Sequence, residues 1–450
     1  MLRDDAIEIW KTGVHAVDSE RLVRQNLAMD GNDLIVCGNR IPLKECQKIE
    51  VVGAGKAGAG MARGVQAAFA EARRFPELSR LQLQGWINVP EDCVEDCGSI
   101  QLHGARPAGI NEPTESGVYG TRDILRRVSR LTEQDLCLVL ISGGGSALLP
   151  APVEQISLAD KLAVTRALAS AGAAIEELNI VRSQLSSVKG GGLVQNCNAG
   201  LMVALIISDV TGDPLEYIAS GPTVDGTSTP ADALRVLKKY ASAANPIPMA
   251  VNEYLTSMQD RPALPHSKSC QNHIIGANRV ALDAAADKAT ELGYEVVNMG
   301  SENCGNARNH GATLAQKLAS LRDKWEDESG ICVLAGGETT VQLATTTTER
   351  KGGRNQEVVL SAINEFSSPE QWRDMVLLSG GTDGEDGPTD AAGAVADEQI
   401  VYEISKRGLC VQDFLAINNS YPILETVNGL LKTGPTHTNV MDLAVGLIGN

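Results

Sequence analysis

Long hydrophobic runs and positive charge are both scarce in this 450-residue sequence. No apolar run reaches the roughly 18 residues that a membrane-spanning helix needs, so we expect no membrane span. The chain has 39 Lys and Arg against 56 Asp and Glu, which gives a formal net charge of −17. Because nucleic acid and anionic membrane surfaces repel an acidic chain, the composition argues against both as partners. An anionic substrate would need local positive groups.

Cysteine and histidine form no pattern that supports a disulfide framework or a metal centre. The ten Cys are scattered, and the C-x-x-x-C pair of Cys93 and Cys97 is a weak signal. Reduced thiols in a cytoplasmic compartment are the simpler interpretation. The acidic start "MLRDDAIEIW" also lacks the apolar core of a signal peptide. The six His lie in no motif and no G-x-S-x-G elbow occurs, which argues against zinc chemistry and Ser-His-Asp hydrolysis.

Glycine, by contrast, is abundant, with 45 residues that cluster in short loops after apolar runs. Apolar strands alternate with amphipathic helices, which predicts an α/β protein. We expect an N-terminal, Rossmann-like, doubly wound parallel sheet with helices on both faces over 1–245. A proline-rich transition at 246–271 and a second α/β domain at 272–450 follow. The expected helices are 4–28, 57–72, 114–131, 157–172, 278–292, 306–321, 355–366 and a helical region at 397–431.

The stretch "VVGAGKAGAGMARG" opens with Gly53, Gly55 and Gly58, which match the dinucleotide fingerprint G-x-G-x-x-G. A dinucleotide fold also needs an acid at the end of the next strand, about 20 residues on. Glu77 lies in that region but ends no expected strand. The remaining features are a strand, a glycine turn, a helix start and Lys56. The backbone N–H groups of a helix start attract an anion, and Lys56 adds a full positive charge that could bind a carboxylate or a transferring phosphoryl group. A solvated loop lysine is the plainer alternative.

Two further glycine loops follow predicted strands or helices. The first, "ISGGGSALL", lets consecutive backbone amides close on phosphates, although a tight strand-to-helix turn would look the same. The second, "SSVKGGGLV", adds a lysine, although a helix stop with a solvated lysine fits it equally. The nucleotide-binding candidates from these loops are Ser142, Gly143, Gly144, Gly145, Ser146, Lys189, Gly190 and Gly191, together with Gly53 and Gly55 of the first turn.

Acidic loops follow two of the predicted strands. Carboxylates at strand ends suit Mg²⁺ or general-base work, although Asp213 before a proline is also a common turn former. Arg354, at a predicted helix start, can clamp a carboxylate or phosphate with two parallel hydrogen bonds, and its alternative is an exposed ion pair. Glycine loops, cations and aspartates together fit phosphoryl transfer. The acidic candidates are Asp209, Asp213, Asp383, Asp386 and Asp390.

Several motifs resemble the type 2 glycerate kinases, whose C-terminal part, here about 331–445, is called the MOFRL domain. The resemblance runs from about residue 6 to 445. The motifs that carry it are "GAGKA", "SGGGSALL", "SDVTGDP", "SGPT", "GGETT", "GGRNQE", "GGTDGEDGPTDAAGA" and "TGPTHTNVMDL". It implies transfer of phosphate from ATP to the 2-hydroxyl of D-glycerate with Mg²⁺, in a cleft between the domains. The rival functions are an NAD(P)-dependent hydroxypyruvate reductase and a non-catalytic sensor of small anions.

The same resemblance assigns roles to individual residues. Lys56 and Arg354 are expected to be the catalytic pair, with Asp209 as a further catalytic or metal-binding group. Asp213 is expected beside the nucleotide, and Asp383 and Asp386 at the metal. The sequence leaves open which aspartate binds metal and which acts as a base. It also leaves open whether the chain forms a homo-oligomer.

Overall fold

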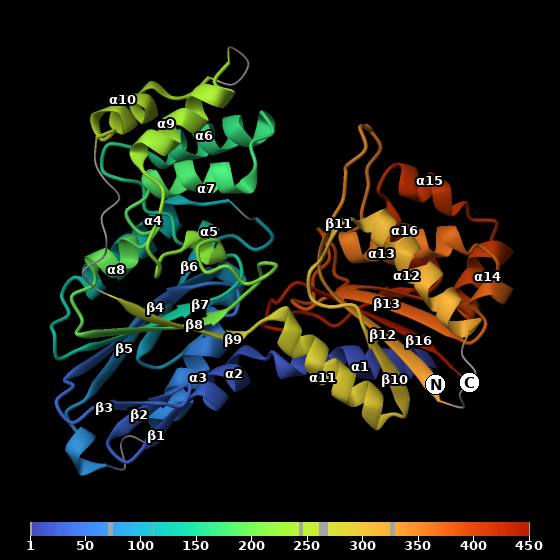
Figure 1. The fold of residues 1–450 in the computed structure, drawn as a ribbon, viewed down its shortest axis with the longest axis horizontal. Coiled ribbons are helices and arrows are strands. Elements are labelled where there is room, and N and C mark those ends of the chain that lie inside the picture. The colour runs from blue at the N-terminus through green and yellow to red at the C-terminus, as the bar shows by residue number, and fades with distance from the viewer. Residues whose placement is uncertain are drawn as a thin grey trace. The chain divides into compact units, whose positions relative to one another are not determined.

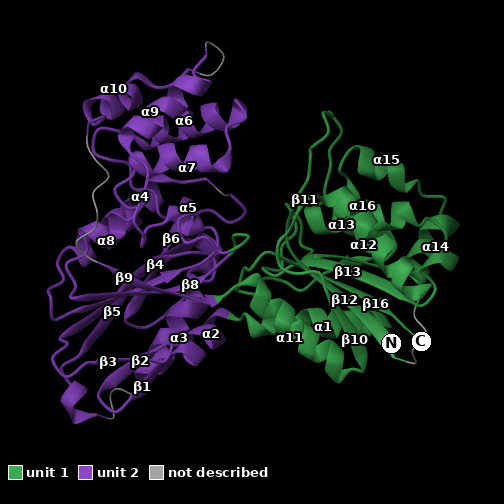
Figure 2. Cartoon of the chain, viewed as in Figure 1, with its two compact units in different colours: residues 1–18, 209–212, 276–450 green, residues 19–208, 213–275 purple. Residues whose placement is uncertain are grey.

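The computed structural model describes residues 2–70, 75–110, 112–242, 246–260, 269–324 and 329–449. The chain divides into two compact units, shown in different colours in Figure 2. Unit 1 contains residues 1–18, 209–212 and 276–450, and unit 2 contains residues 19–208 and 213–275. The chain therefore starts in unit 1, builds most of unit 2 and then returns. No helix among the described residues is both long and apolar enough to cross a membrane.

Unit 2 is built on a six-stranded sheet with the order β6-β5-β4-β7-β8-β9 (Figure 1). The pairs β6–β5, β5–β4, β4–β7 and β7–β8 are parallel. The order runs outward from β4 in one direction and from β7 in the other, which is the doubly wound arrangement. This confirms the predicted Rossmann-like fold. The strands are β4 (Lys48–Ala54), β5 (Gln82–Pro90), β6 (Ile100–Arg106), β7 (Leu136–Ile141), β8 (Leu201–Ile207) and β9 (Cys270–Gly276).

Helices cover both faces of this sheet, and further helices pack together in a separate cluster (Figure 1). Thr114 and Ser157 cap two of the helices through their side-chain oxygens, as their positions predict. An antiparallel sheet of β1 (Leu27–Asp30), β2 (Asp33–Val36) and β3 (Asn39–Pro42) was not predicted. The helices of unit 2 are α2 (Ser19–Asn26), α3 (Gly58–Ala70), η2 (Pro76–Leu78), η3 (Glu91–Cys93), α4 (Glu115–Val128), α5 (Gly145–Leu148), α6 (Leu158–Ser170), α7 (Ile175–Gln184), α8 (Gly192–Asn196), η4 (Ile218–Ser220), α9 (Pro230–Tyr240) and α10 (Met249–Ser257).

Unit 1 contains a second sheet, in the order β10-β12-β16-β13-β14-β15, with β11 paired to β12. The strands β10 and β11 run parallel to β12, whereas β16 is antiparallel to both β12 and β13. The last strand of the chain therefore lies in the middle of the sheet. The strands are β10 (Tyr294–Asn298), β11 (Asn303–Asn306), β12 (Gly330–Thr340), β13 (Met375–Gly381), β14 (Gly393–Asp397), β15 (Leu430–Leu431) and β16 (Asp442–Ile448).

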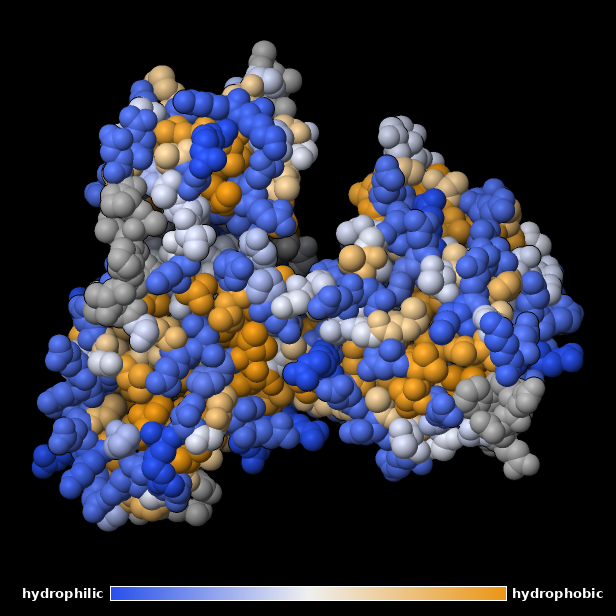
Figure 3. All heavy atoms as spheres, in the orientation of Figure 1, coloured by the Kyte–Doolittle hydropathy of each residue, from blue (hydrophilic) through white to orange (hydrophobic). Residues whose placement is uncertain are grey.

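Two hydrophobic cores lie on opposite faces of this sheet. Helices α1 (Leu2–Ala16) and α11 (Asn278–Glu291) enclose one core, through buried residues such as Trp10 and Leu282. The remaining helices enclose the other, as Figure 1 shows. They are α12 (Ala307–Arg322), α13 (Arg354–Glu365), η5 (Pro369–Trp372), α14 (Glu398–Lys406), α15 (Val411–Ala416) and α16 (Ser420–Thr426). Figure 3 shows polar residues over most of the visible face of each unit, with smaller hydrophobic areas between them.

The observed division differs from the predicted one at the N-terminus. The sequence predicted one helix over 4–28 inside the first domain, but the structure has two helices, and the first belongs to unit 1. The carbonyl of Val17 accepts a hydrogen bond of 2.5 Å from the hydroxyl of Thr438, and the chain leaves unit 1 there. Part of the predicted transition, 261–268, lies outside the described residues.

Replacing Trp10 by Ala should therefore destabilise unit 1. Trp10 is 1% exposed, and its indole N–H donates to the carbonyl of Gly380. Loss of a buried Trp typically costs about 3–5 kcal/mol. Amide hydrogen exchange should accelerate in β13 and β16, while Lys11→Ala, at the exposed neighbouring position, should leave exchange unchanged. Faster exchange confined to β4 and β7 would contradict the assignment of this helix to unit 1.

Candidate active site

The turn with Lys56 and the glycine loop after β7 meet at the point where the strand order of unit 2 reverses. Strands β4 and β7 are parallel neighbours, so both loops leave the same edge of the sheet. The backbone N–H of Lys56 donates to the carbonyl of Gly143 at 2.9 Å. The N–H of Ala57 donates to the hydroxyl of Ser142 at 3.1 Å. Two predicted loops are thus joined into one structure.

Gly53 and Gly55 make this junction sterically feasible. A Cβ on Gly53 would lie 1.9 Å from the carbonyl oxygen of Leu140, and one on Gly55 would lie 1.9 Å from the Ser142 hydroxyl. Gly55 also has φ +149°, in the region that side chains disfavour. These contacts give both glycines a packing role. Packing alone explains why glycine occupies both positions. The presence of glycine is therefore no evidence for the predicted contact with a nucleotide.

The backbone amides of the turn are engaged with the protein. Besides the amides of Lys56 and Ala57, the N–H of Gly55 donates to the carbonyl of Asn88 and that of Gly58 donates to Gly55. A dinucleotide cradle binds pyrophosphate through such amides. Since all four are already donated, the side chain of Lys56 is what this turn offers to an anion.

The acid expected for a dinucleotide fold was sought in the wrong place. The strand that follows β4 is β5, which ends at Pro90, and Glu91 comes next. Glu77 lies in η2, before β5 begins, and is therefore not at a strand end. Glu91 is exposed. The engaged amides of the turn, rather than a missing acid, are therefore what argues against a dinucleotide cradle.

The hydroxyl of Ser146 accepts hydrogen bonds from two cationic side chains, Lys189 and Arg182. The Lys189 ammonium donates to the Ser146 hydroxyl at 2.6 Å, to its carbonyl at 3.1 Å and to the Ser220 hydroxyl at 3.0 Å. The guanidinium of Arg182 also donates to the Ser146 hydroxyl. Lys189 is 4% exposed, so the alternative of a solvated lysine is wrong. Arg182, from α7, was not singled out from the sequence.

The glycines beside Lys189 have a different role from the predicted one. The N–H of Gly190 donates to Ser220 at 3.0 Å, and that of Gly191 donates to Gly221 at 2.7 Å. Both residues have positive φ, at 55° and 81°. Their amides thus tie this loop to the segment after η4. The expectation that these amides cradle phosphate is not supported, because they are satisfied within the protein.

A second cation flanks the glycine loop after β7. A Cβ built on Gly144 would lie 3.4 Å from a guanidinium nitrogen of Arg106 and 3.6 Å from Cγ of Lys56. Arg106 ends β6 and is 3% exposed. Gly144 has φ +78°. The loop with Ser142, Gly143, Gly144, Gly145 and Ser146 therefore passes between basic side chains from several elements.

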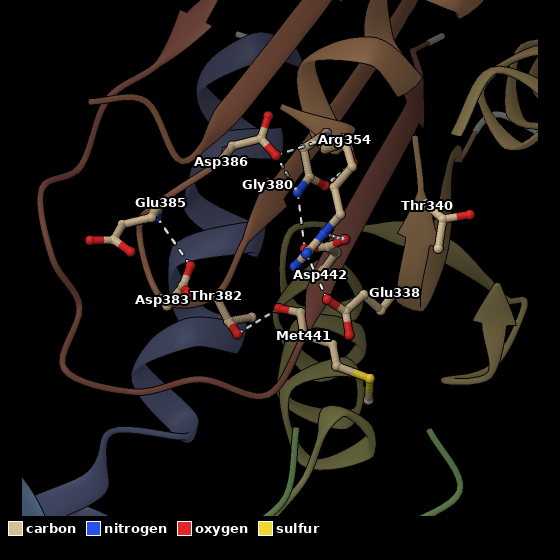
Figure 4. Close-up of polar contacts among 12 residues, drawn as sticks. Glu338, Thr340, Arg354, Gly380, Thr382, Asp383, Glu385, Asp386, Met441 and Asp442 are labelled. Atoms are coloured by element: carbon tan, nitrogen blue, oxygen red, sulfur yellow. Dashed lines mark hydrogen bonds and ion pairs between the residues drawn. The ribbon is translucent and has the colours of Figure 1, made fainter. Parts of the chain in front are cut away.

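Arg354 of unit 1 is held by two carboxylates (Figure 4). Its Nε and Nη2 donate to Asp442 at 2.6 and 2.9 Å, and Nη1 lies 2.6 Å from Glu338. Burial disfavours the charge of Arg354, but Asp442 and Glu338 outweigh it and raise the pKa. The exposed ion pair considered from the sequence is therefore replaced by a partly buried network. Glu338 and Asp442 were present in the quoted motifs but were not predicted as site residues.

Other carboxylates act on the same network. Burial raises the pKa of Glu338, and repulsion from Asp442, Asp209 and Asp383 raises it further, against the attraction of Arg354. Oxygen ligands of this kind suit a hard cation such as Mg²⁺. Among the described residues, however, no group of three carboxylate, imidazole or thiolate side chains is placed to hold a metal ion alone.

Asp386 and Asp209 have a different placement from the expected one, whereas Asp213 lies in the expected domain. Asp386 is 2% exposed, and its carboxylate oxygens accept the backbone N–H groups of Asn355 and Gln356, so it caps α13. Asp213 belongs to unit 2, whereas Asp209 belongs to unit 1. Asp213 also has φ +55°, which suits the turn-forming alternative. The predicted metal role of Asp386 therefore competes with a helix cap.

A cavity of about 650 Å³ opens beside Arg354 within unit 1. Glu338, Thr339, Arg350 and Gly353 are among the residues that line it. The Thr339 hydroxyl is buried and has no hydrogen-bond partner among the described residues.

Two family models match the chain. A domain described as of unknown function, DUF4147, matches residues 5–256, and the MOFRL family matches residues 331–442. A glycerate kinase of Danio rerio is 36% identical, with 99% of this chain and 98% of that protein covered. A D-glycerate 2-kinase of Thermotoga maritima is 35% identical, with 99% and 98% covered.

Solved structures give the same result. The crystal structure of a glycerate kinase from Thermotoga maritima is 33% identical, with a TM-score of 0.81 and 99% of each chain covered. A second structure, of a protein from Pyrococcus horikoshii, has a TM-score of 0.80 at 31% identity, with 100% of this chain and 98% of that chain covered. The likeness therefore extends over both units.

Replacing Asp442 by Asn should destabilise unit 1 by about 1.5–3 kcal/mol, the usual worth of a hydrogen bond to a charged group. Among the described residues, the amide would leave the partly buried Arg354 with Glu338 as its one carboxylate within ion-pair distance. Urea denaturation measures the change. Asp390→Asn is the matched control, because the Asp390–Lys432 pair is exposed and solvent screens its attraction, so the loss should be smaller. Equal losses in the two variants would contradict a special role for Asp442.

Proposed function

We propose that this chain, which belongs to the glycerate kinase family with a C-terminal MOFRL domain, transfers phosphate from ATP to the 2-hydroxyl of D-glycerate. The products would be 2-phospho-D-glycerate and ADP. The Thermotoga maritima relative is named D-glycerate 2-kinase, which supports both the substrate and the position.

The observation that carries this proposal is the arrangement around the glycine loop after β7. Lys56 and Arg106 flank Gly144, and Lys189 and Arg182 bind Ser146. Phosphoryl transfer requires positioning and neutralisation of charge more than a covalent nucleophile. Cations fixed by buried contacts provide such neutralisation without reorganisation during the reaction.

In this proposal Lys56 and Arg354 are the catalytic residues. Lys56 neutralises the transferring phosphoryl group or the glycerate carboxylate. Arg354 is already oriented by Asp442 and Glu338, so little conformational entropy is lost when it meets a substrate anion. Asp209 is the proposed base or metal contact, since it lies near enough to Glu338 to raise its pKa.

We also propose that the reaction uses Mg²⁺, with Asp209 and Asp383 as its protein contacts. Mg²⁺ is commonly bound by one or two carboxylates together with substrate phosphates, which fits a site without three clustered donors. The bound ion would offset the negative charge of the phosphates. Asp386 is the weaker candidate, because both of its oxygens already accept amide hydrogens.

Hydroxypyruvate reduction, the rival function, has little support. The relatives from Danio rerio and Thermotoga maritima are named as kinases, and the amides that a dinucleotide would need are donated to the protein. A single purified preparation distinguishes the two functions. With ATP, Mg²⁺ and D-glycerate, an enolase-coupled assay should respond without any mutase. A preparation that oxidises NADH with hydroxypyruvate, or forms only 3-phosphoglycerate, would refute the proposal.

Lys56→Ala should lower kcat by about 10²–10³, the usual loss when a preorganised charge at the reacting centre is removed. Lys56→Arg should restore only part of the rate, because the planar guanidinium is bulkier than an ammonium in this tight turn. Lys44→Ala, at an exposed position in the same unit, is the control and should react normally. Turnover of Lys56→Ala within about twofold of the parent would mean that Lys56 is not catalytic.

A further inference from the structure

Three cationic side chains converge in the helical part of unit 2. Lys161 lies on α6, Arg182 on α7, and Lys189 in the loop before α8. Arg182 and Lys189 both donate to the Ser146 hydroxyl. Lys161 is close enough for its charge to repel both of the others. The site thus combines one cation from each of three chain segments.

No carboxylate lies within ion-pair distance of any of these three cations in the described parts of the chain. Their hydrogen-bond partners are neutral oxygens, namely those of Ser146, Ser220 and Asn179. Burial lowers the pKa of Lys161 to about 7, with a further contribution from Arg182. Burial also places the pKa of Lys189 well below its usual value. The free site therefore holds three basic groups without a carboxylate partner, and burial favours the neutral form of its two lysines until an anion binds.

Lys161 is the most unusual member of this group. It is 6% exposed, and its ammonium nitrogen has no hydrogen-bond partner among the described residues. It shares the inward face of α6 with Leu158, Val164 and Leu168, at spacings where an apolar side chain would pack. A buried ammonium is costly unless an anion or acceptor meets it. If this position served packing alone, an apolar side chain such as Met or Leu would stabilise the fold more than Lys161 does.

We propose that Lys161 and Arg182 complete, with Lys189, a subsite around Ser146 that binds the phosphate groups of the nucleotide. The ligand supplies the negative charge, because no carboxylate of the described residues pairs with these three side chains. Three cations match a polyphosphate better than glycerate, which has a single carboxylate. Ser146 belongs to the same loop as Ser142, which receives the N–H next to Lys56, so the subsite is continuous with the Lys56 turn. The identity of the ligand rests on the proposed kinase function.

Calorimetric titration without turnover tests this subsite. The probes are inorganic tripolyphosphate, ADP and adenosine, and the variants are Lys161→Met and the control Lys238→Met on the exposed side of α9. Lys161→Met should weaken tripolyphosphate and ADP binding at least about tenfold, since it removes a charged hydrogen-bond donor. Adenosine binding and the Lys238→Met variant should be unaffected. Unchanged tripolyphosphate affinity in Lys161→Met would overturn the proposal.

Melting temperature separates ligand binding from a structural role. Because Lys161→Met removes a buried amine that has no hydrogen-bond partner among the described residues, the ligand-free variant should melt at or above the temperature of the parent while binding more weakly. A lower melting temperature with unchanged affinity would assign Lys161 to the fold and overturn the proposal. Should Lys161→Met not fold, Arg182→Met is titrated in its place, with the same loss of tripolyphosphate affinity expected and the same result overturning the proposal.

The outcomes for this subsite and for the kinase function are distinguishable. Lys161-dependent binding of tripolyphosphate by a protein that does not phosphorylate glycerate would support the subsite and refute the kinase. An active glycerate kinase whose Lys161→Met variant keeps its KM for ATP would support the kinase and overturn the subsite. Loss of glycerate binding with intact tripolyphosphate binding would also overturn it, because the site would then take the acceptor carboxylate.

Discussion

The close approach of β4 and β7 is the constraint on which the proposed chemistry depends. Gly53 lies so near the carbonyl of Leu140, and Gly55 so near Ser142, that no side chain fits at either position. The two loops can therefore exchange backbone hydrogen bonds, which fix where Lys56 leaves the turn. The same contacts occupy the amides of the turn. In the proposed function, recognition of an anion at this turn is therefore assigned to the side chain of Lys56 rather than to backbone amides.

The two units hold their cations by different means. In unit 1, Arg354 is matched by Asp442 and Glu338, so its charge and orientation exist before any ligand arrives. In unit 2, Lys189 and Arg182 bind the neutral hydroxyl of Ser146, which orients them but does not neutralise them. A matched cation presents a fixed geometry, whereas unmatched cations present a net potential. Phosphoryl transfer uses both properties, since it depends on position and on charge.

Most of the fold could be predicted because it depends on local signals. Apolar runs gave β4, β7 and β8, and the caps at Thr114 and Ser157 marked helix starts that the structure confirms. The position of β16 between β12 and β13 depends on pairing across distant parts of the chain, which periodicity does not encode. The N-terminal helix was placed in the wrong domain for the same reason, because its amphipathic pattern does not reveal which core it joins.

The candidate site was predicted less completely, for a related reason. Glycine loops and strand-end acids are visible in short motifs, so Lys56, Lys189 and Arg354 could be found. Arg182 was missed because it reaches Ser146 from a helix 36 residues away in sequence. Asp386 was visible as an acid, but its role as a cap of α13 depends on amides 30 and 31 residues earlier. Motifs identify polar residues, whereas their partners depend on the tertiary fold.

A net charge of −17 and a buried group of cations are compatible because they act over different distances. Salt screens surface charges beyond about 8 Å at physiological ionic strength, so the acidic surface has little effect on a nucleotide already in the site. Buried cations are screened much less, and their interaction with a phosphate is stronger in the lower dielectric. The same burial destabilises the free protein at Lys161. A ligand that supplies the missing negative charge removes that penalty, so part of its binding free energy comes from relief of an unfavourable free state.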